Sequence, residues 1–272
     1  MSSGVNKDQR ALSEARLEDY LARIARGELA VSNFLTPGEK KQAERYLAHR
    51  GAARNAVFWG GYPDAERQCL YLLPDYLVDI PELMPPPGTD PAETVDADEL
   101  AVCAVRIKGS GFRKLGHRDY LGSLLGLGLE RDAIGDIAMQ NDYEAVVFCS
   151  LRLSRFLCSS LEKISTDTVK CTPWSLDDSF TDGRHYRPIS DTVASPRLDC
   201  VVAALTNLSR EAAQTAIRSG TVDVDFENEE RTDRMLTPPA TISIRGHGRY
   251  ILRSFDGETK KGRLRLRADQ LV

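Results

Sequence analysis

The sequence predicts an α+β protein of three small units: an N-terminal helical/α+β region, a ferredoxin-like middle domain and a C-terminal domain of helices and strands. Three observations lead to this prediction. The 272 residues, 42% hydrophobic and 28% charged, are enough for two or three separate cores. Helical and strand-like hydrophobic periods alternate along the chain. Two polar, turn-rich stretches, at 76–99 and 174–191, divide it into expected domains at 1–75, 100–173 and 192–272.

The first domain is expected to contain two helices followed by two strands. Apolar residues between Leu12 and Ile24 recur at three- and four-residue spacings, and Gly27 is a suitable stop for this helix. A second helix is indicated by Thr36, a suitable N-cap, and by Glu39, its capping-box partner. Two short strands are expected at 55–59 and 68–73.

Charge is divided unevenly along the chain. From Asp75 to Glu99 there are eight acidic residues and no basic one, around a proline run at 85–87. This composition is typical of a solvated, proline-stiffened linker. From Arg245 to Arg267 there are instead eight Lys and Arg residues against two acids. Because local charge matters more for binding than the sum, the net charge of −4 does not exclude a nucleic-acid partner.

The middle domain has a β-α-β-β-α-β order. Its strands are expected at 100–107, 135–139, 144–149 and 167–172, and its helices at 117–127 and 151–164. This order predicts a ferredoxin-like split βαβ sandwich, the RRM-like architecture of many RNA-recognition modules. A basic group lies between its first strand and first helix, and it is either an RNA contact or a solvated helix start.

The last domain is expected to open with two helices. Its helices are placed at 197–205 and 209–219, and its strands at 221–225, 241–245, 249–254 and 263–267. Ser209 is a natural N-cap for the second helix, and Gly220 is a natural residue to end it. Arg210 and Arg218, with Gln214 between them, should share one face of that helix.

A second set of cations surrounds a glycine-flanked turn at His247. Arg245, Arg249 and Arg253 recur at four-residue intervals and share a face if the turn keeps the strand register. The glycines on both sides of His247 allow a close backbone approach and leave its imidazole free to stack or donate. Charge runs are usually solvated faces, so these residues become RNA candidates only beside a family pattern.

Four runs in the C-terminal domain follow such a pattern: Arg197-Leu198-Asp199, 208–213, 217–224 and 242–249. Their order resembles the RNA-binding domain first seen in small-subunit ribosomal protein S-four, the αL motif. The resemblance implies that two helices and a hairpin present a basic face to structured RNA. The chain departs from the family pattern at Glu211, Asp225 and 238–240, which removes donors or adds repulsion near phosphates.

Further motifs extend over nearly the whole chain. They lie at 34–39 and 60–67, at 115–122, 127–131 and 134–137, and at 260–263. These runs resemble the bacterial YlmH family. The resemblance implies a ribosome-associated factor that binds the large subunit, with its rRNA and peptidyl-tRNA, in rescue or quality control of stalled translation. It also implies a looser link to cell division.

The expected RNA-binding residues fall into two groups. In the C-terminal domain they are Arg197, Ser209, Arg210, Gln214, Arg218, Arg245, His247, Arg249, Arg253, Lys260, Lys261 and Arg263. In the middle domain they are Lys108, Arg113, Lys114, His117 and Arg118. The partners expected for these residues are structured RNA, namely rRNA of the large subunit and tRNA, and the ribosome.

Other classes of site have little support in the sequence. Six cysteines are scattered without a CxxC pair or a Cys/His cluster, so neither a metal site nor a disulfide framework is indicated. The polar start and the short apolar runs indicate neither a signal peptide nor a membrane span. We therefore expect a cytoplasmic monomer without metal, cofactor or membrane partner.

Three motifs suggest enzymes but lack the rest of an active site. His117-Arg118-Asp119 is similar to the kinase catalytic loop, but Leu124 stands where that loop has Asn. Gly109-Ser110-Gly111 lacks the third glycine of a dinucleotide loop. Arg197-Leu198-Asp199 is similar to the catalytic tripeptide of pseudouridine synthases, which need a large separate catalytic domain. We expect no catalysis, and the alternatives are a pseudouridine synthase-like RNA-modifying enzyme or a cell-division scaffold with RNA binding.

Overall fold

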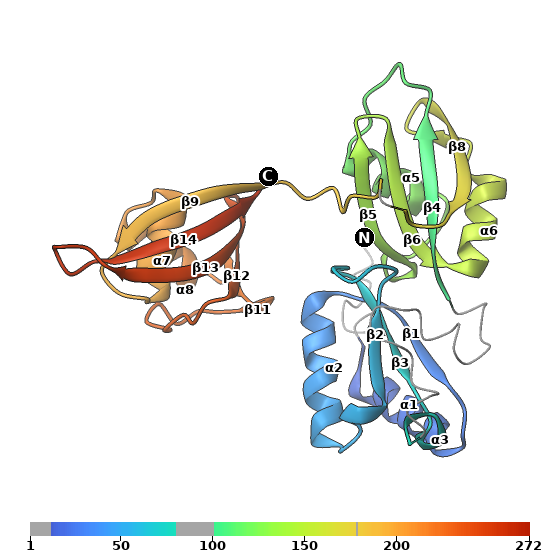
Figure 1. The fold of residues 1–272 in the computed structure, drawn as a ribbon, viewed down its shortest axis with the longest axis horizontal. Coiled ribbons are helices and arrows are strands. Elements are labelled where there is room, and N and C mark those ends of the chain that lie inside the picture. The colour runs from blue at the N-terminus through green and yellow to red at the C-terminus, as the bar shows by residue number, and fades with distance from the viewer. Residues whose placement is uncertain (1–11, 80–100, 178) are drawn as a thin grey trace, which may run out of the picture. The chain divides into compact units, whose positions relative to one another are not determined.

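The computed structural model describes residues 12–79, 101–177 and 179–272. The chain divides into two compact units, Met1–Gly183 and Arg184–Val272. Both mix helices and strands, which confirms the α+β prediction (Figure 1). The first unit contains the expected N-terminal and middle domains, each with its own sheet. Most of the acidic linker expected at 76–99 lies outside the described residues.

The N-terminal domain is a three-stranded sheet with two main helices. Its elements are α1 Glu14–Ala25, β1 Ala30–Leu35, α2 Pro37–His49, a 3-10 turn Ala53–Asn55, β2 Ala56–Trp59, β3 Gln68–Leu72 and α3 Asp75–Val78. The predicted capping box is confirmed, since Glu39 N donates to Thr36 Oγ1 and Thr36 N donates to the Glu39 carboxylate. Strand β1 was not predicted. It buries the polar Ser32, whose Oγ accepts a hydrogen bond from Leu70 N, so apolar alternation is interrupted.

The middle domain has the predicted ferredoxin-like topology. Its elements are β4 Val102–Gly109, α5 His117–Gly126, a 3-10 turn Arg131–Ala133, β5 Ile134–Asn141, β6 Glu144–Ser150, α6 Leu151–Ser160, β7 Lys163–Ile164 and β8 Asp167–Trp174. The antiparallel sheet has the order β5-β6-β4-β8-β7, and both helices pack on one face around Val105, Tyr120 and Leu157. Helix α6 is shorter than expected because Leu161 is extended and Ser165 turns the chain with φ 55°.

Aromatic side chains cover the opposite face of this sheet. The ring of Tyr62, from the loop between β2 and β3, lies 4.9 Å from that of Phe148, and the ring of Phe180 lies 5.1 Å from that of Tyr62. Gly61, with φ +99°, is required here because a Cβ would come within 2.3 Å of Phe148. RNA-recognition modules stack bases on this sheet face. In this chain the ring of Phe148 on that face is covered by Tyr62 and Phe180.

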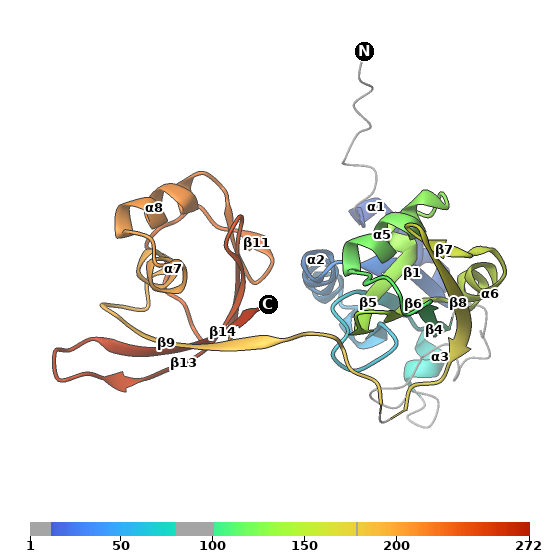
Figure 2. The ribbon, with the colours of Figure 1, turned by 90° about the horizontal axis from the view of Figure 1, so that it is seen from above.

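The C-terminal unit is a six-stranded antiparallel sheet with two helices on one face. Its elements are β9 Tyr186–Val193, α7 Leu198–Thr206, α8 Arg210–Arg218, β10 Val222–Val224, β11 Glu227–Asn228, β12 Ala240–Ile244, β13 Gly248–Glu258 and β14 Leu264–Leu271. The strand order is β11-β10-β12-β13-β14-β9, and the core joins Val202 and Ile217 of the helices to Ile242 and Leu252 of the sheet. Figure 2 shows both helices on the same side of the long β13–β14 ribbon.

Strand β9 corrects the expectation of a linker over 174–191. It pairs with β14 along its whole length, from Tyr186 opposite Leu271 to Val193 opposite Leu264. As the outermost strand of the sheet it is mostly exposed and buries only its last residue, so it lacks the apolar alternation of an inner strand. Within the described residues, no helix is long and apolar enough to span a membrane.

Candidate nucleic-acid interface

A buried carboxylate organises the surface of the two C-terminal helices. Asp199, in the first turn of α7, has no exposed side-chain surface. Its oxygens accept hydrogen bonds from Arg197 Nε at 3.1 Å, from Arg210 Nε at 3.0 Å and from Gln214 Nε2 at 2.7 Å. Burial alone would raise the pKa of Asp199, but these hydrogen bonds together hold it well below its ordinary value.

Three predicted RNA-binding residues therefore come together, but around a protein carboxylate. Arg210 keeps 56% of its side chain exposed and Arg197 keeps 34%, so each guanidinium has free edges beyond its bond to Asp199. Asp199 cancels one of these two positive charges. The two guanidinium groups remain as oriented hydrogen-bond donors, and their planar shape matches the oxygens of a phosphate group.

The other predicted residues of α8 differ in their availability. The Ser209 hydroxyl caps the helix by accepting from Ala212 N at 3.1 Å. Arg218, in the last turn, is exposed and has no partner among the residues that the structure describes. Arg218 is therefore the unengaged cation of this helix.

The cations of β12 and β13 are directed differently from those of the helices. Ile242, Tyr250 and Leu252 point into the core with the helices, so alternation directs Arg249 and Arg253 away from them. Arg249 lies 5.4 Å from the ring of Phe226, and Arg253 pairs with Asp269 at 2.7 Å. Of the three arginines expected to share a face, Arg249 and Arg253 do so, but this face is not that of α7 and α8. Arg245 directly follows the end of β12 and is exposed.

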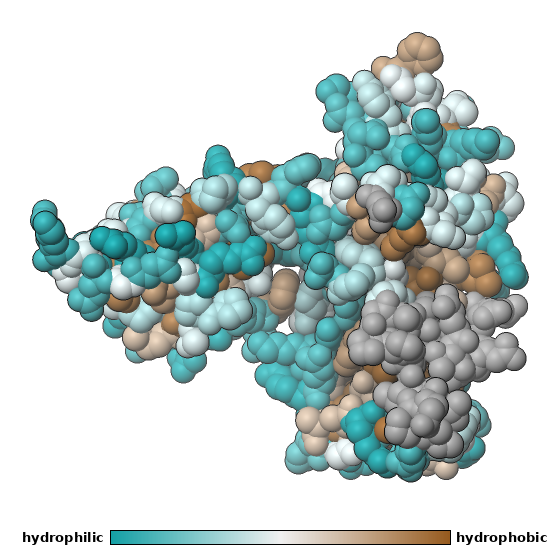
Figure 3. Space-filling model, viewed as in Figure 1, coloured by the Kyte–Doolittle hydropathy of each residue, from teal (hydrophilic) through white to brown (hydrophobic). Residues whose placement is uncertain are grey.

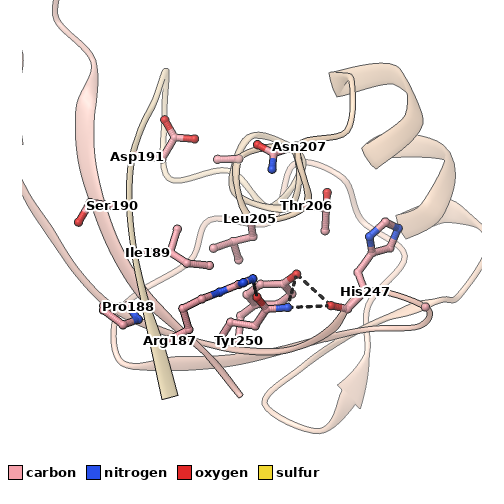
Figure 4. Close-up of a pocket in the computed structure, with 13 residues that line it drawn as sticks. Arg187, Pro188, Ile189, Ser190, Asp191, Leu205, Thr206, Asn207, His247 and Tyr250 are labelled. Carbon is pink, nitrogen blue, oxygen red and sulfur yellow. Dashed lines mark hydrogen bonds between the residues drawn. The ribbon is translucent and has the colours of Figure 1, made fainter. Parts of the chain in front are cut away.

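The β12–β13 turn borders a surface hollow of about 620 Å³ (Figure 4). The backbone oxygen of His247 accepts from Tyr250 Oη at 3.0 Å and from Gln270 Nε2 at 3.3 Å, while its imidazole is exposed. Gln270 in turn accepts from Arg187. The volume lies within the usual range of small-ligand sites, about 300–1,000 Å³, but Arg187, Tyr250 and Gln270 are already engaged in these hydrogen bonds.

The β13–β14 hairpin ends in further cations. Lys260 and Lys261 are exposed at its tip, where the visible surface is strongly hydrophilic (Figure 3). Arg263 is held against β9, because its Nε donates to Thr192 Oγ1 at 3.0 Å. The two lysines are therefore more available to a partner than Arg263.

The predicted basic group of the middle domain lies on and around the loop between β4 and α5. Lys108 and Arg118 are exposed, Arg113 donates to Thr166 Oγ1, and Lys114 pairs with Asp142 at 2.5 Å. Surrounding protein atoms and the positive charge of Arg131 lower the pKa of His117, which favours its neutral form at pH 7. This group contains free cations and paired ones.

Sequence reasoning missed the most exposed ring of this loop. Phe112 follows Gly111 and precedes Arg113 and Lys114, and 97% of it is exposed. The signal was an aromatic residue between a glycine turn and two basic residues, a combination found in nucleic-acid-binding loops.

Comparisons with known proteins agree with the order of the domains. Residues 15–77 match the family described as "YlmH, N-terminal", and residues 96–178 match the one described as "Putative RNA-binding domain in YlmH". Together the matches span more than half of the chain. The chain is 29% identical over 261 residues to ribosome-associated protein quality control protein P2 of Bacillus subtilis (strain 168), covering 96% of this chain and 94% of that protein.

A solved structure is also similar. It is that of the cell division protein ylmH from Streptococcus pneumoniae, with a TM-score of 0.45 and 18% identity, over 64% of this chain and 96% of that one.

Proposed function

Because this chain belongs to the YlmH family, we propose that it is an RNA-binding protein of ribosome-associated quality control, with rRNA of the large subunit and tRNA as its ligands. The similarity to the Bacillus subtilis quality control protein runs along almost the full length of both chains, which supports a shared role. Since translation takes place in the cytoplasm, the proposed role belongs there.

The observation that carries this proposal is the arrangement around Asp199. A buried carboxylate fixes Arg197 and Arg210 in orientation, while both guanidinium groups reach the surface. Arginine contacts to phosphate gain from such a fixed, forked geometry, because less side-chain freedom is lost on binding. The S-four-type RNA-binding role expected from the sequence fits two helices that present cations in this way.

The same arrangement argues against the pseudouridine synthase alternative. A catalytic aspartate must reach the base that it attacks. Asp199 is fully buried and holds three side chains by hydrogen bonds, so it is closed to a substrate. We therefore propose that the protein binds RNA without modifying it. The cell-division scaffold remains a second candidate role, motivated by the family resemblance alone.

Sucrose-gradient fractionation of the tagged protein tests the proposal. The wild type should travel with the large subunit, and the double variant Arg210→Ala/Arg218→Ala should shift to the top of the gradient. A matched control is Arg152→Ala/Arg155→Ala, which removes two exposed arginines from α6. Circular dichroism should verify that each variant is folded. A wild type that stays free of ribosomes at low salt would contradict the ribosomal role.

A further inference from the structure

The loop between β4 and α5, residues 110–116, carries an aromatic ring into solvent. Phe112 is 97% exposed, more than any other large hydrophobic side chain in the described residues. The end of this loop, uppermost in Figure 1, is hydrophobic in Figure 3. Burying a phenylalanine ring away from water is favourable, so a ring that is 97% exposed can contribute binding free energy to a partner.

The start of this loop is firmly attached to the sheet. Ser110 N and Oγ both donate to the carboxylate of Asp167, at 3.0 and 2.5 Å, and these bonds lower the pKa of Asp167. Gly109 N donates to Tyr143 O at 2.8 Å. A Cβ at Gly109 would lie 2.6 Å from the Asp167 carboxylate, so glycine is needed for this close approach.

The end of the loop is attached as well. Leu115 N donates to Asp142 O at 2.7 Å, and the Leu115 side chain is buried in the core. Arg113 Nη1 donates to Thr166 Oγ1 at 2.5 Å. With both ends attached, the backbone of the loop that carries Phe112 has less freedom to lose on binding, which reduces the entropy cost.

Positive charge gathers at the same end of the sheet. Lys108 and Lys170 stand directly opposite each other on β4 and β8, and both are exposed. Like charges in this position destabilise a sheet, and an anion between them would relieve that repulsion. Glu144, on the neighbouring strand β6, also lies opposite Lys108, but its carboxylate forms an ion pair with Arg106 Nε at 2.5 Å.

We propose that Phe112 stacks on an unpaired RNA base while Lys108 and Lys170 contact the adjacent backbone phosphates. One ring beside several cations is the combination that recognises single-stranded nucleic acid, since every base offers a face and every linkage a charge. The sheet face on which RNA-recognition modules usually stack bases is covered here by Tyr62 and Phe180. This inference rests on the proposed RNA-binding function and adds the element recognised: a base in a loop or bulge.

The test uses the full chain and two RNA hairpins of equal length and charge. One has an apical loop of unpaired purines, and the other has abasic residues at the same loop positions. Binding is measured for the wild type, Phe112→Ala, Phe112→Leu and Phe112→Trp. Phe156→Ala is the matched control, because it removes another exposed ring from α6, which begins at the opposite end of the sheet.

We expect the wild type to prefer the purine loop, and Phe112→Ala to weaken binding to that loop by roughly 5- to 100-fold. The variant should bind the abasic hairpin as the wild type does. Phe112→Trp should retain the preference and Phe112→Leu should lose most of it. Unchanged thermal melting of Phe112→Ala would show that the fold is intact, as the exposure of the ring implies.

Other outcomes separate this inference from the function on which it rests. If the wild type binds both hairpins and Phe112→Ala behaves identically, stacking by Phe112 is overturned and RNA binding stands. If the wild type binds neither hairpin nor ribosomal RNA, both proposals fail. Binding to phosphatidylglycerol–phosphatidylethanolamine vesicles that depends on Phe112, without an RNA preference, would assign the ring to a lipid surface and overturn the RNA assignment.

Discussion

Arg210 Nε lies 3.0 Å from the fully buried carboxylate of Asp199, so a candidate RNA-contacting cation on the surface also satisfies a buried charge. The two residues are eleven positions apart, on different helices. Removing Arg210 would leave Arg197 and Gln214 to satisfy the carboxylate. An RNA-binding defect in an Arg210 variant therefore has to be separated from a loss of stability.

Asp199→Asn should destabilise the C-terminal unit. The substitution leaves two guanidinium groups without their anion and breaks a buried ion pair, which costs about 2–4 kcal/mol once the partial exposure of the arginines is considered. Both tryptophans, Trp59 and Trp174, lie in the first unit. The thermal transition followed by tryptophan fluorescence should therefore occur at the wild-type temperature. Far-ultraviolet circular dichroism should show an additional transition at a lower temperature.

The matched control for this prediction is Asp191→Asn on the exposed strand β9, which removes the same charge from the same unit. It should melt like the wild type. Equal melting of Asp199→Asn and Asp191→Asn would mean that the buried carboxylate contributes nothing to stability.

Acid should weaken the C-terminal unit through Glu229. Hydrogen bonds from Arg231, together with Arg234, lower its pKa from 4.5 to about 2. A carboxyl group whose pKa is lowered by folding stabilises the protein at pH values above its pKa in the unfolded chain. This stabilisation is lost as the pH falls through the pKa of the folded state. We expect part of the stability to disappear between pH 4.5 and 2.

Acid titrations followed by circular dichroism test this expectation. Glu229→Gln should be less stable at neutral pH and show a shallower decline in the acid range. Glu258→Gln, which removes an exposed carboxylate of β13, should keep the wild-type slope. A wild-type slope in Glu229→Gln would exclude Glu229 as a source of the acid response.

Asp136→Ala should loosen the joint between the N-terminal and middle domains. The carboxylate of Asp136 accepts from Tyr62 Oη at 2.7 Å, Glu66 N at 2.8 Å and Arg67 N at 3.1 Å. Donors left without an acceptor cost about 1–3 kcal/mol each when buried, so we expect a loss of about 2–3 kcal/mol for these partly exposed groups. Here tryptophan fluorescence should register the earlier transition.

Limited proteolysis adds a local measurement for this joint. The loop at 60–67 should become cleavable in Asp136→Ala, whereas Asp142→Ala, an exposed carboxylate of the same domain, should protect the loop as the wild type does. Equal protection in both variants would show that Asp136 does not hold the loop.

Local signals in the sequence were enough to place most elements. Helix α2 was predicted from Thr36 and Glu39 because a capping box acts over three residues. The order of the middle domain followed from hydrophobic periods, which reflect burial on one face. Strand β9 escaped prediction because an exposed edge strand is stabilised mainly by hydrogen bonds to its neighbour, here β14, and such bonds leave no pattern in the sequence.

The candidate site was less predictable because it depends on contacts between distant residues. Asp199 was noted only within the Arg197-Leu198-Asp199 run, because its bonds to Arg210 and Gln214 join two helices and have no sequence signature. The four-residue spacing of Arg249 and Arg253 gave their common face. It could not show that the two helices lie on the other side of the sheet.

This difference in face gives a final prediction, on the salt dependence of RNA binding. Each phosphate contact contributes about one to the slope of log affinity against log salt concentration. Arg218 is exposed on α8, whereas Arg253 lies on the outer face of the sheet, paired with Asp269. If RNA lies against the helices, Arg218→Ala should lower the slope by about one and Arg253→Ala should leave it unchanged. The reverse result would place the RNA on the sheet face, where Arg253 would have to exchange Asp269 for a phosphate.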